Sequence, residues 1–198
     1  SNLELMMHEL TDRFVAALNY ATHLHRNQFR KGERVPYISH LYAVAGLVME
    51  AGGSEDEVIG ALLHDAVEDQ GGLPRLEEIR QQFGDQVAEI VDGCTDAYEE
   101  PKPLWRPRKE AYVAHITAAS DSVRLVSNAD KLHNARSILA DFREVGEAIW
   151  DRFSASRDET LWYYRSLADL FSQRPANSFL ARELDRTVTL LEEESRSS

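Results

Sequence analysis

The chain has 198 residues with 34 acidic and 22 basic side chains, which gives a net charge of −12. This length fits one domain with a substantial hydrophobic core, and the negative charge argues against a general nucleic-acid-binding protein. The single cysteine, Cys94, excludes an intramolecular disulfide and is typical of a reducing compartment. Because no apolar run approaches membrane-spanning length and no basic-then-apolar leader is visible, we expect a cytoplasmic protein without a membrane partner.

Apolar residues recur at spacings of three and four along nearly the whole chain, whereas the alternation typical of strands is almost absent. We therefore expect an all-α fold, a single-domain helical bundle over about residues 3–195. The longest loop is expected at 97–107, which holds three of the six prolines. A capping box of Ser54 and Glu57 marks one helix start. The expected helices are about 3–29, 37–51, 55–70, 75–83, 85–96, 108–119, 122–142, 157–171 and 177–194.

Residues 61–69 form an apolar segment that carries four ionisable side chains, His64, Asp65, Glu68 and Asp69. On one continuous helix these residues would fall within an arc of about 140°. Because a buried carboxylate is costly unless a cation or donor compensates it, three acids beside a histidine indicate a counter-charge such as a divalent metal. His64 and Asp65 would bind the metal, leaving Glu68 and Asp69 for acid–base chemistry. The alternative is an acidic helix end at the surface.

His40 and Asp130 also stand in apolar surroundings, on helices remote in sequence from that segment. Each alone is more typical of a structural role, as a hydrogen-bonded core histidine or as a capping or surface aspartate. The order of the set is a histidine, then a His-Asp pair, then an aspartate, with helices between. This order resembles the HD superfamily of metal-dependent phosphohydrolases. The resemblance implies that His40, His64, Asp65 and Asp130 bind one divalent metal.

A set of five motifs narrows the resemblance to the hydrolase domain of the RelA/SpoT family, over residues 30–137. The resemblance implies a helical bundle of the HD type, a metal that is usually manganese, and removal of the 3′-pyrophosphate from guanosine tetraphosphate. It also implies a stand-alone hydrolase, since no segment is left for an alarmone synthetase. The motifs are Arg30-Lys31-Gly32 with Pro36-Tyr37-Ile38-Ser39-His40, His64-Asp65-Ala66-Val67-Glu68-Asp69, Phe83-Gly84, Val91-Asp92-Gly93-Cys94-Thr95 and Asp130-Lys131-Leu132-His133-Asn134.

The resemblance implies a role for each matching residue. Glu68 and Asp69 correspond to the pair that activates or orients the attacking water. The chain departs from the family at Leu41, where proline is common, and at Asp96, where lysine is usual. Neither departure touches the metal set, so hydrolysis is better supported than the identity of the substrate. The positions that correspond to purine, phosphate and nucleoside contacts are Arg30, Lys31, Asn134 and Ser137.

A phosphate-rich substrate needs local cations in so acidic a chain. Besides Arg30 and Lys31, the candidates are Lys102, Arg106, Arg108 and Lys109, and the alternative for this group is a solvated loop. On the C-terminal helix, Arg157 and Tyr163 are candidates to close the far side of the pocket, with core packing as the alternative for the aromatic cluster. His133, three residues after Asp130, is expected only to pack or cap locally.

The leading hypothesis is a metal-dependent pyrophosphohydrolase that acts on guanosine tetra- or pentaphosphate, a small-molecule partner. A second hypothesis keeps the metal but changes the nucleotide to the 2′-phosphate of NADPH or to 5′-nucleotides. A third is a nucleotide-binding sensor without turnover, although such a sensor would not need Glu68 and Asp69. A set of histidines and carboxylates suits manganese, iron, zinc or cobalt equally. The oligomeric state stays open.

Overall fold

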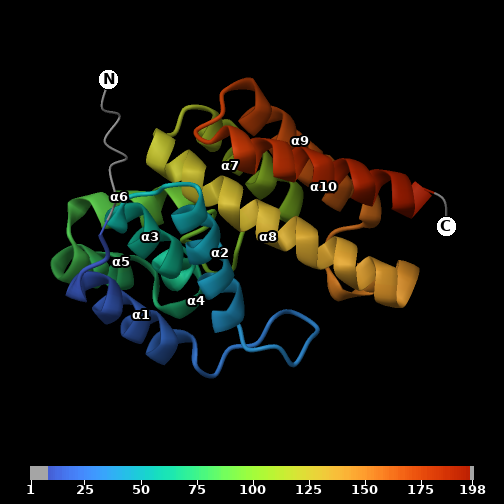
Figure 1. Ribbon diagram of the computed structural model, residues 1–198. Helices are drawn as coiled ribbons and strands as arrows, with labels where there is room; N and C mark the ends of the chain where they lie inside the picture. Colours follow the sequence, from blue (N-terminus) through green and yellow to red (C-terminus); the bar gives the residue numbers. More distant parts are fainter. Residues whose placement is uncertain (1–8, 197–198) are drawn as a thin grey trace, which may run out of the picture.

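The computed structural model describes residues 9–196, and the prediction of an all-α fold is confirmed (Figure 1). An isolated β-bridge joins Phe29 and Pro36. Residues 3–8 of the predicted first helix lie outside the described range. The helices are α1 (Asp12–His25), α2 (Ile38–Glu50), α3 (Glu55–Leu63), α4 (Ala66–Gln70), α5 (Gly72–Phe83), α6 (Asp85–Cys94), α7 (Trp105–Thr117), α8 (Asp121–Val145), the 3-10 helix η1 (Gly146–Arg152), α9 (Arg157–Gln173) and α10 (Ser178–Arg196).

The long helix α8 runs across the middle of the molecule. Figure 1 shows it in yellow and orange, with α9 and α10 on one side and α2 and α3 on the other, and it contacts all four. Val126, Ala129 and Leu132 on this helix are fully buried. Because this face of α8 lies in the core, Asp130 faces other helices, whereas Arg136 on another face of α8 is exposed.

Side-chain caps fix the starts of several helices. Thr11 accepts a hydrogen bond from the first turn of α1, and Ser120 and Ser156 do the same for α8 and α9. The capping box predicted at Ser54 and Glu57 is confirmed, with both reciprocal hydrogen bonds present. Each cap satisfies backbone donors that a helix start leaves free, so these boundaries follow from local sequence.

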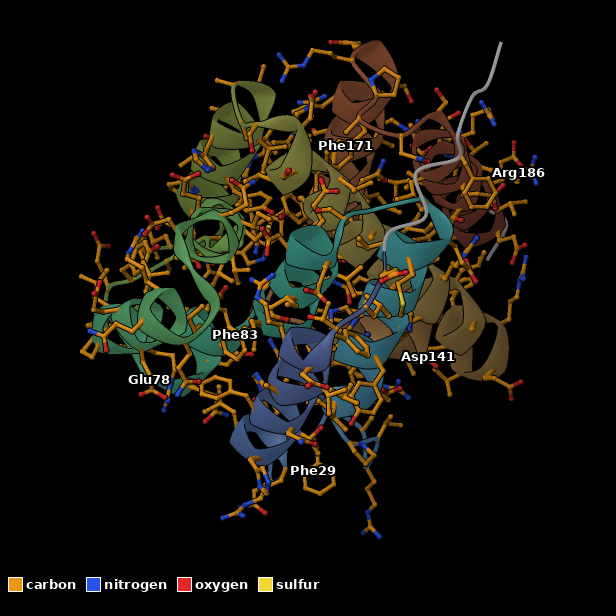
Figure 2. The ribbon with its side chains drawn as sticks, turned by 60° about the vertical axis from the view of Figure 1, so that its left-hand side comes forward. Phe29, Glu78, Phe83, Asp141, Phe171 and Arg186 are labelled. Atoms are coloured by element: carbon orange, nitrogen blue, oxygen red, sulfur yellow. The ribbon has the colours of Figure 1, made fainter. Side chains whose placement is uncertain are left out.

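The first helix ends at His25, not at about Phe29 as predicted. Residues 26–37 fold back as a loop, in which Arg30 N donates to Val35 O at 2.8 Å and Tyr37 N donates to Gln28 O at 2.8 Å. Gly32 turns this loop with a φ of +73°, a conformation that favours glycine. In Figure 2, Phe29 projects from the edge of the molecule, and it is 55% exposed.

The predicted helix over residues 55–70 is interrupted, so the expected continuous arc of four ionisable residues is wrong. α3 ends at Leu63, and Asp65 leaves helical geometry with φ −100° and ψ 1° before α4 begins. The carbonyl of Ala61 contacts the Nδ1 atom of His64 at 2.6 Å. That carbonyl would pair with the Asp65 N–H in an unbroken helix, so the side chain of His64 competes with the helical ladder.

Other boundaries differ by a few residues. α5 begins at Gly72 rather than at 75, and α7 begins at Trp105 rather than at 108, so the proline-rich loop is shorter than predicted. α8 extends to Val145 and continues into η1. Among the described helices, none has both the length and the apolar character needed to cross a bilayer.

Candidate metal centre and nucleotide pocket

Four side chains from three parts of the fold meet in the interior. His40 lies on α2, His64 and Asp65 form the break between α3 and α4, and Asp130 lies on α8. Each offers one ligand atom, and these atoms all lie within 4.8 Å of one another. Both histidines are 1% exposed and Asp130 is 7% exposed. The structure thus brings together the four residues that the sequence singled out for metal binding.

The interruption of the helix between α3 and α4 directs the Nε2 atom of His64 toward the cluster. This nitrogen lies 3.1 Å from Asp65 Oδ2 and 3.3 Å from Asp130 Oδ1. Its Nδ1 atom faces a carbonyl, which only accepts hydrogen bonds, so Nδ1 carries the proton. Nε2 is buried and makes no hydrogen bond among the described residues. A bare nitrogen facing two carboxylates requires a proton or a metal cation between them, so the donor set fits a divalent metal.

Electrostatics at the cluster also favour a cation. Burial disfavours a charged His64, but the carboxylates of Asp65 and Asp130 outweigh burial and raise its pKa well above the ordinary value. The Nε2 atom of His40 lies 2.9 Å from Asp130 Oδ1. The Nζ atom of Lys131 lies 3.0 Å from the other oxygen of Asp130 and compensates part of the negative charge. The negative charge that Lys131 does not compensate would stabilise a bound metal cation.

Glu68 lies on α4, just after the His64-Asp65 break. Burial raises the pKa of Glu68 to about 7, together with the carboxylates of Asp96 and Asp65, while Lys102 acts in the opposite direction. The Oε1 atom of Glu68 accepts a hydrogen bond from Lys102 Nζ at 2.8 Å. A carboxylate with a pKa near neutrality suits a general base.

Asp69 follows Glu68 and has a different partner. Burial and the carboxylate of Asp65 raise the pKa of Asp69 to about 6, and a hydrogen bond from Gln28 opposes the shift. Gln28 Nε2 donates to Asp69 Oδ2 at 3.0 Å. Asp69 is therefore held in place by a neutral hydrogen-bond donor, whereas Glu68 is held by a charged one.

Cavities extend from the cluster toward the loop of residues 26–37. The cavity beside the cluster has a volume of about 130 Å³. The neighbouring cavity measures about 230 Å³ and shares Tyr37 and Asn134 with the first. A third cavity of about 210 Å³ shares Lys31 and Tyr164 with the second. Together they provide adjoining spaces next to the proposed metal ligands.

Most of the predicted nucleotide contacts line these spaces. Arg30 Nη2 donates to Asn134 Oδ1 at 3.2 Å, and both residues line the 230 Å³ cavity. Ser137 lines the same cavity, and its hydroxyl donates to the carbonyl of His133. Lys31 lines both the 230 Å³ and the 210 Å³ cavities. The structure therefore places these residues together, as the motif order predicts.

The cations of the proline-rich loop and α7 have acidic partners. Lys102 contacts Glu68, as described above. Lys109 Nζ lies 2.6 Å from Asp96 Oδ2, and Arg108 Nε lies 3.7 Å from the same atom. Arg108 and Lys109 also line the 210 Å³ cavity. Arg106, in contrast, pairs with exposed Glu110 on its own helix.

Two predicted residues on α9 are placed less favourably. Tyr163 is 5% exposed and packs in an aromatic cluster with Trp105 and Trp162. The next residue, Tyr164, lines both the 230 Å³ and the 210 Å³ cavities. Arg157 has a buried Nε atom that lacks a hydrogen-bond partner within the described range. On α9, Tyr164 thus lines the cavities, one position after the tyrosine expected, because helix register decides which tyrosine faces them.

Three side chains that the sequence analysis left without a role support the site. Tyr37 donates a hydrogen bond to Asp65, and Gln28 donates to Asp69. His133 contacts the ring of His40. The position of Tyr37 within the histidine motif was a usable signal. No sequence signal pointed to Gln28, because its contact with Asp69 depends on how residues 26–37 fold back.

Comparisons with known proteins identify the family of this chain. The HD-domain family matches residues 17–161. A Xenopus tropicalis protein named guanosine-3′,5′-bis(diphosphate) 3′-pyrophosphohydrolase MESH1 is 39% identical over 125 residues, which cover 62% of this chain and 67% of the relative. A Haemophilus influenzae 3′-pyrophosphohydrolase is 38% identical over 121 residues, 58% of this chain but only 17% of that protein.

A solved structure supports the fold. It is described as a metazoan orthologue of SpoT that hydrolyses ppGpp, and it aligns with a TM-score of 0.75 and 24% identity over 91% of this chain and 96% of its own. The chain therefore belongs to the HD-domain family. The more specific resemblance to the RelA/SpoT hydrolase domain, predicted from five motifs, is confirmed by the relatives.

Proposed function

We propose that this protein is a metal-dependent pyrophosphohydrolase that removes the 3′-pyrophosphate of guanosine tetra- or pentaphosphate. The main support is the buried cluster of His40, His64, Asp65 and Asp130 with two high-pKa carboxylates on the next helix. Relatives that are 38–39% identical to this chain carry the same activity in their names. A sensor without turnover would need the cluster at most for binding, and would not need Glu68 and Asp69.

The residues of this chain divide the work of hydrolysis. His40, His64, Asp65 and Asp130 would hold a divalent metal, which lowers the pKa of water and neutralises charge on phosphoryl oxygens. Glu68 accepts a proton from the attacking water, and Gln28 holds Asp69 beside it. The water oxygen forms a bond to the phosphorus attached to the ribose 3′-oxygen. The bond between this phosphorus and the ribose 3′-oxygen breaks, pyrophosphate leaves with the water oxygen, and the proton taken up by Glu68 balances the one gained by the 3′-oxygen.

Substrate binding is assigned to the cavities beside the cluster. Arg30 and Lys31 would contact the phosphates and the purine, and Asn134 and Ser137 the nucleoside. Lys102, Arg108 and Lys109 supply further positive charge near the metal centre in a chain whose net charge is −12. Tyr164 takes the place first given to Tyr163 at the pocket wall. For Arg157, a contact with substrate stays a prediction.

Manganese is the metal we propose, because the RelA/SpoT resemblance implies it and the mixed histidine and carboxylate set accepts it. We also propose a cytoplasmic location, which the single free cysteine, Cys94, supports.

A nucleotide panel tests the proposed function. Guanosine 3′,5′-bispyrophosphate, NADPH and 5′-monophosphates are each incubated with Mn²⁺, Zn²⁺ or Mg²⁺, and pyrophosphate and orthophosphate are measured separately. We expect pyrophosphate from the guanosine substrate, with Mn²⁺ the most effective metal. Orthophosphate alone, or faster cleavage of NADPH, would move the protein to another nucleotide phosphatase activity. Binding without any product would identify a sensor.

A further inference from the structure

In the two histidines of the proposed metal centre, the ring nitrogens that point away from the cluster have different hydrogen-bond partners. The Nδ1 atom of His64 donates to the carbonyl of Ala61 on its own helix. The Nδ1 atom of His40 instead meets a second imidazole, since it lies 2.7 Å from Nδ1 of His133. The two rings are 4.9 Å apart between centroids and inclined at 40°. His40 therefore depends on a side chain of α8 for its outer contact.

The hydrogen positions follow from what each nitrogen faces. His40 Nε2 points to the cluster, 2.9 Å from Asp130 Oδ1 and 3.9 Å from Asp65 Oδ2. A metal at the cluster takes the Nε2 lone pair, so the proton of a neutral His40 must sit on Nδ1. The Nδ1 atom of His133 must then accept this proton in a hydrogen bond, and the proton of a neutral His133 sits on its own Nε2.

We propose that His133 is a positioning residue for the metal centre, which fixes the tautomer and the ring orientation of His40 without binding the metal itself. This inference rests on the proposed function only in requiring that a divalent metal binds to the cluster. Outer hydrogen bonds of this kind commonly change metal affinity by about 10- to 100-fold. His133 is also well placed, because it lies one helical turn after Asp130 on α8. The same helix thus supplies one ligand and the outer contact of another.

The test measures Mn²⁺ affinity by titration calorimetry in the full chain. His133→Phe removes the acceptor and should raise the Kd for Mn²⁺ by about 10- to 100-fold. His133→Gln keeps an acceptor and should recover at least half of that loss on a logarithmic scale. His115→Phe is the matched control, since His115 is also a helical histidine with a ring contact, 3.1 Å from Gly93 O, but lies outside the cluster. Its Kd should equal that of the wild type.

Four outcomes would contradict the proposal or its basis. Unchanged Mn²⁺ affinity in His133→Phe, or equal weakening in the Gln and Phe variants, would overturn the role of His133 alone. A wild-type protein that binds no Mn²⁺ would overturn the metal centre itself. If the Phe variant does not fold, the tautomer of His40 can be measured instead, by ¹⁵N NMR of the wild-type protein with diamagnetic Zn²⁺ bound. A proton on Nδ1 of His40 is expected, and its absence would refute the assignment.

Discussion

Glu68 and Asp69 are neighbours with different surroundings, and this difference assigns them different work. Glu68 contacts the cationic Lys102, whereas Asp69 contacts the neutral Gln28. An incoming phosphate can compete for Lys102, because the lysine prefers whichever anion offers more charge. Glu68 would then be free to accept a proton from the attacking water. The hydrogen bond of Asp69 does not take part in this exchange, because its donor is Gln28.

Glu68→Gln separates proton transfer from metal binding. The amide keeps the shape and the contact with Lys102 but cannot accept a proton, so kcat should fall by about 10²-fold or more. Metal content should remain that of the wild type. The measurements are pyrophosphate release and bound Mn²⁺. Glu110→Gln, on the exposed face of α7, is the control and should change neither. Loss of metal together with activity would make Glu68 a ligand.

The pKa values of these acids predict an acidic limb in the activity profile. Burial and nearby carboxylates raise the pKa of Glu68 to about 7 and that of Asp69 to about 6. The base is active only when deprotonated, so kcat should fall as pH decreases through this range. A bound metal favours the deprotonated form, and therefore the midpoint should lie no higher than about 7. Turnover at saturating Mn²⁺ checks this, and a kcat that stays constant down to about pH 5 would contradict it.

At the scale of elements, glycines set how closely the helices near the site approach. A Cβ atom on Gly60 of α3 would lie 2.6 Å from Ile90 Cγ2 of α6. Gly60→Ala should therefore destabilise the protein by about 1–3 kcal/mol through overpacking. Gly46 on α2 has open space around it, and Gly46→Ala should stabilise the protein by about 0.5–1 kcal/mol. Urea unfolding of both variants tests the contrast. Equal effects of the two substitutions would refute the packing argument.

Sequence patterns were informative about elements wherever local physics decides the structure. The capping box at Ser54 was correct because it involves only neighbouring residues. The break at His64 was missed because apolar periodicity continues through it, and the competing hydrogen bond to Ala61 becomes visible only in three dimensions. The convergence of the four proposed metal ligands could be expected from motif order. The contacts of Gln28, His133 and Tyr164 could not, since they depend on loop path and helix register.

At the scale of the whole molecule, the proposed metal would join three separate parts of the fold. Its ligands come from α2, the α3–α4 break and α8. A metal that binds only the folded state stabilises it by about 2.7 kcal/mol at 100 times its Kd. For a chain of this size, removal with a chelator should lower the thermal midpoint by about 5–10 °C. Asp130→Ala should abolish the increase in thermal midpoint that Mn²⁺ produces. Asp185→Asn, far from the cluster in sequence, should retain that increase. A chelator without effect on the wild type would contradict this prediction.

The placement of the site residues along α8 limits where residues can be inserted into this protein. Asp130, His133, Asn134 and Ser137 share one face of a continuous helix. One inserted residue between them would rotate everything that follows by about 100° and turn the pocket residues away from the metal centre. Between α6 and α7, Asp96 lies next to the end of α6 and contacts Lys109, and Lys102 reaches Glu68 through a flexible side chain, so residues 97–101 carry no such constraint on register. Natural and engineered insertions should therefore be tolerated between residues 97 and 101 and be rejected between 130 and 137.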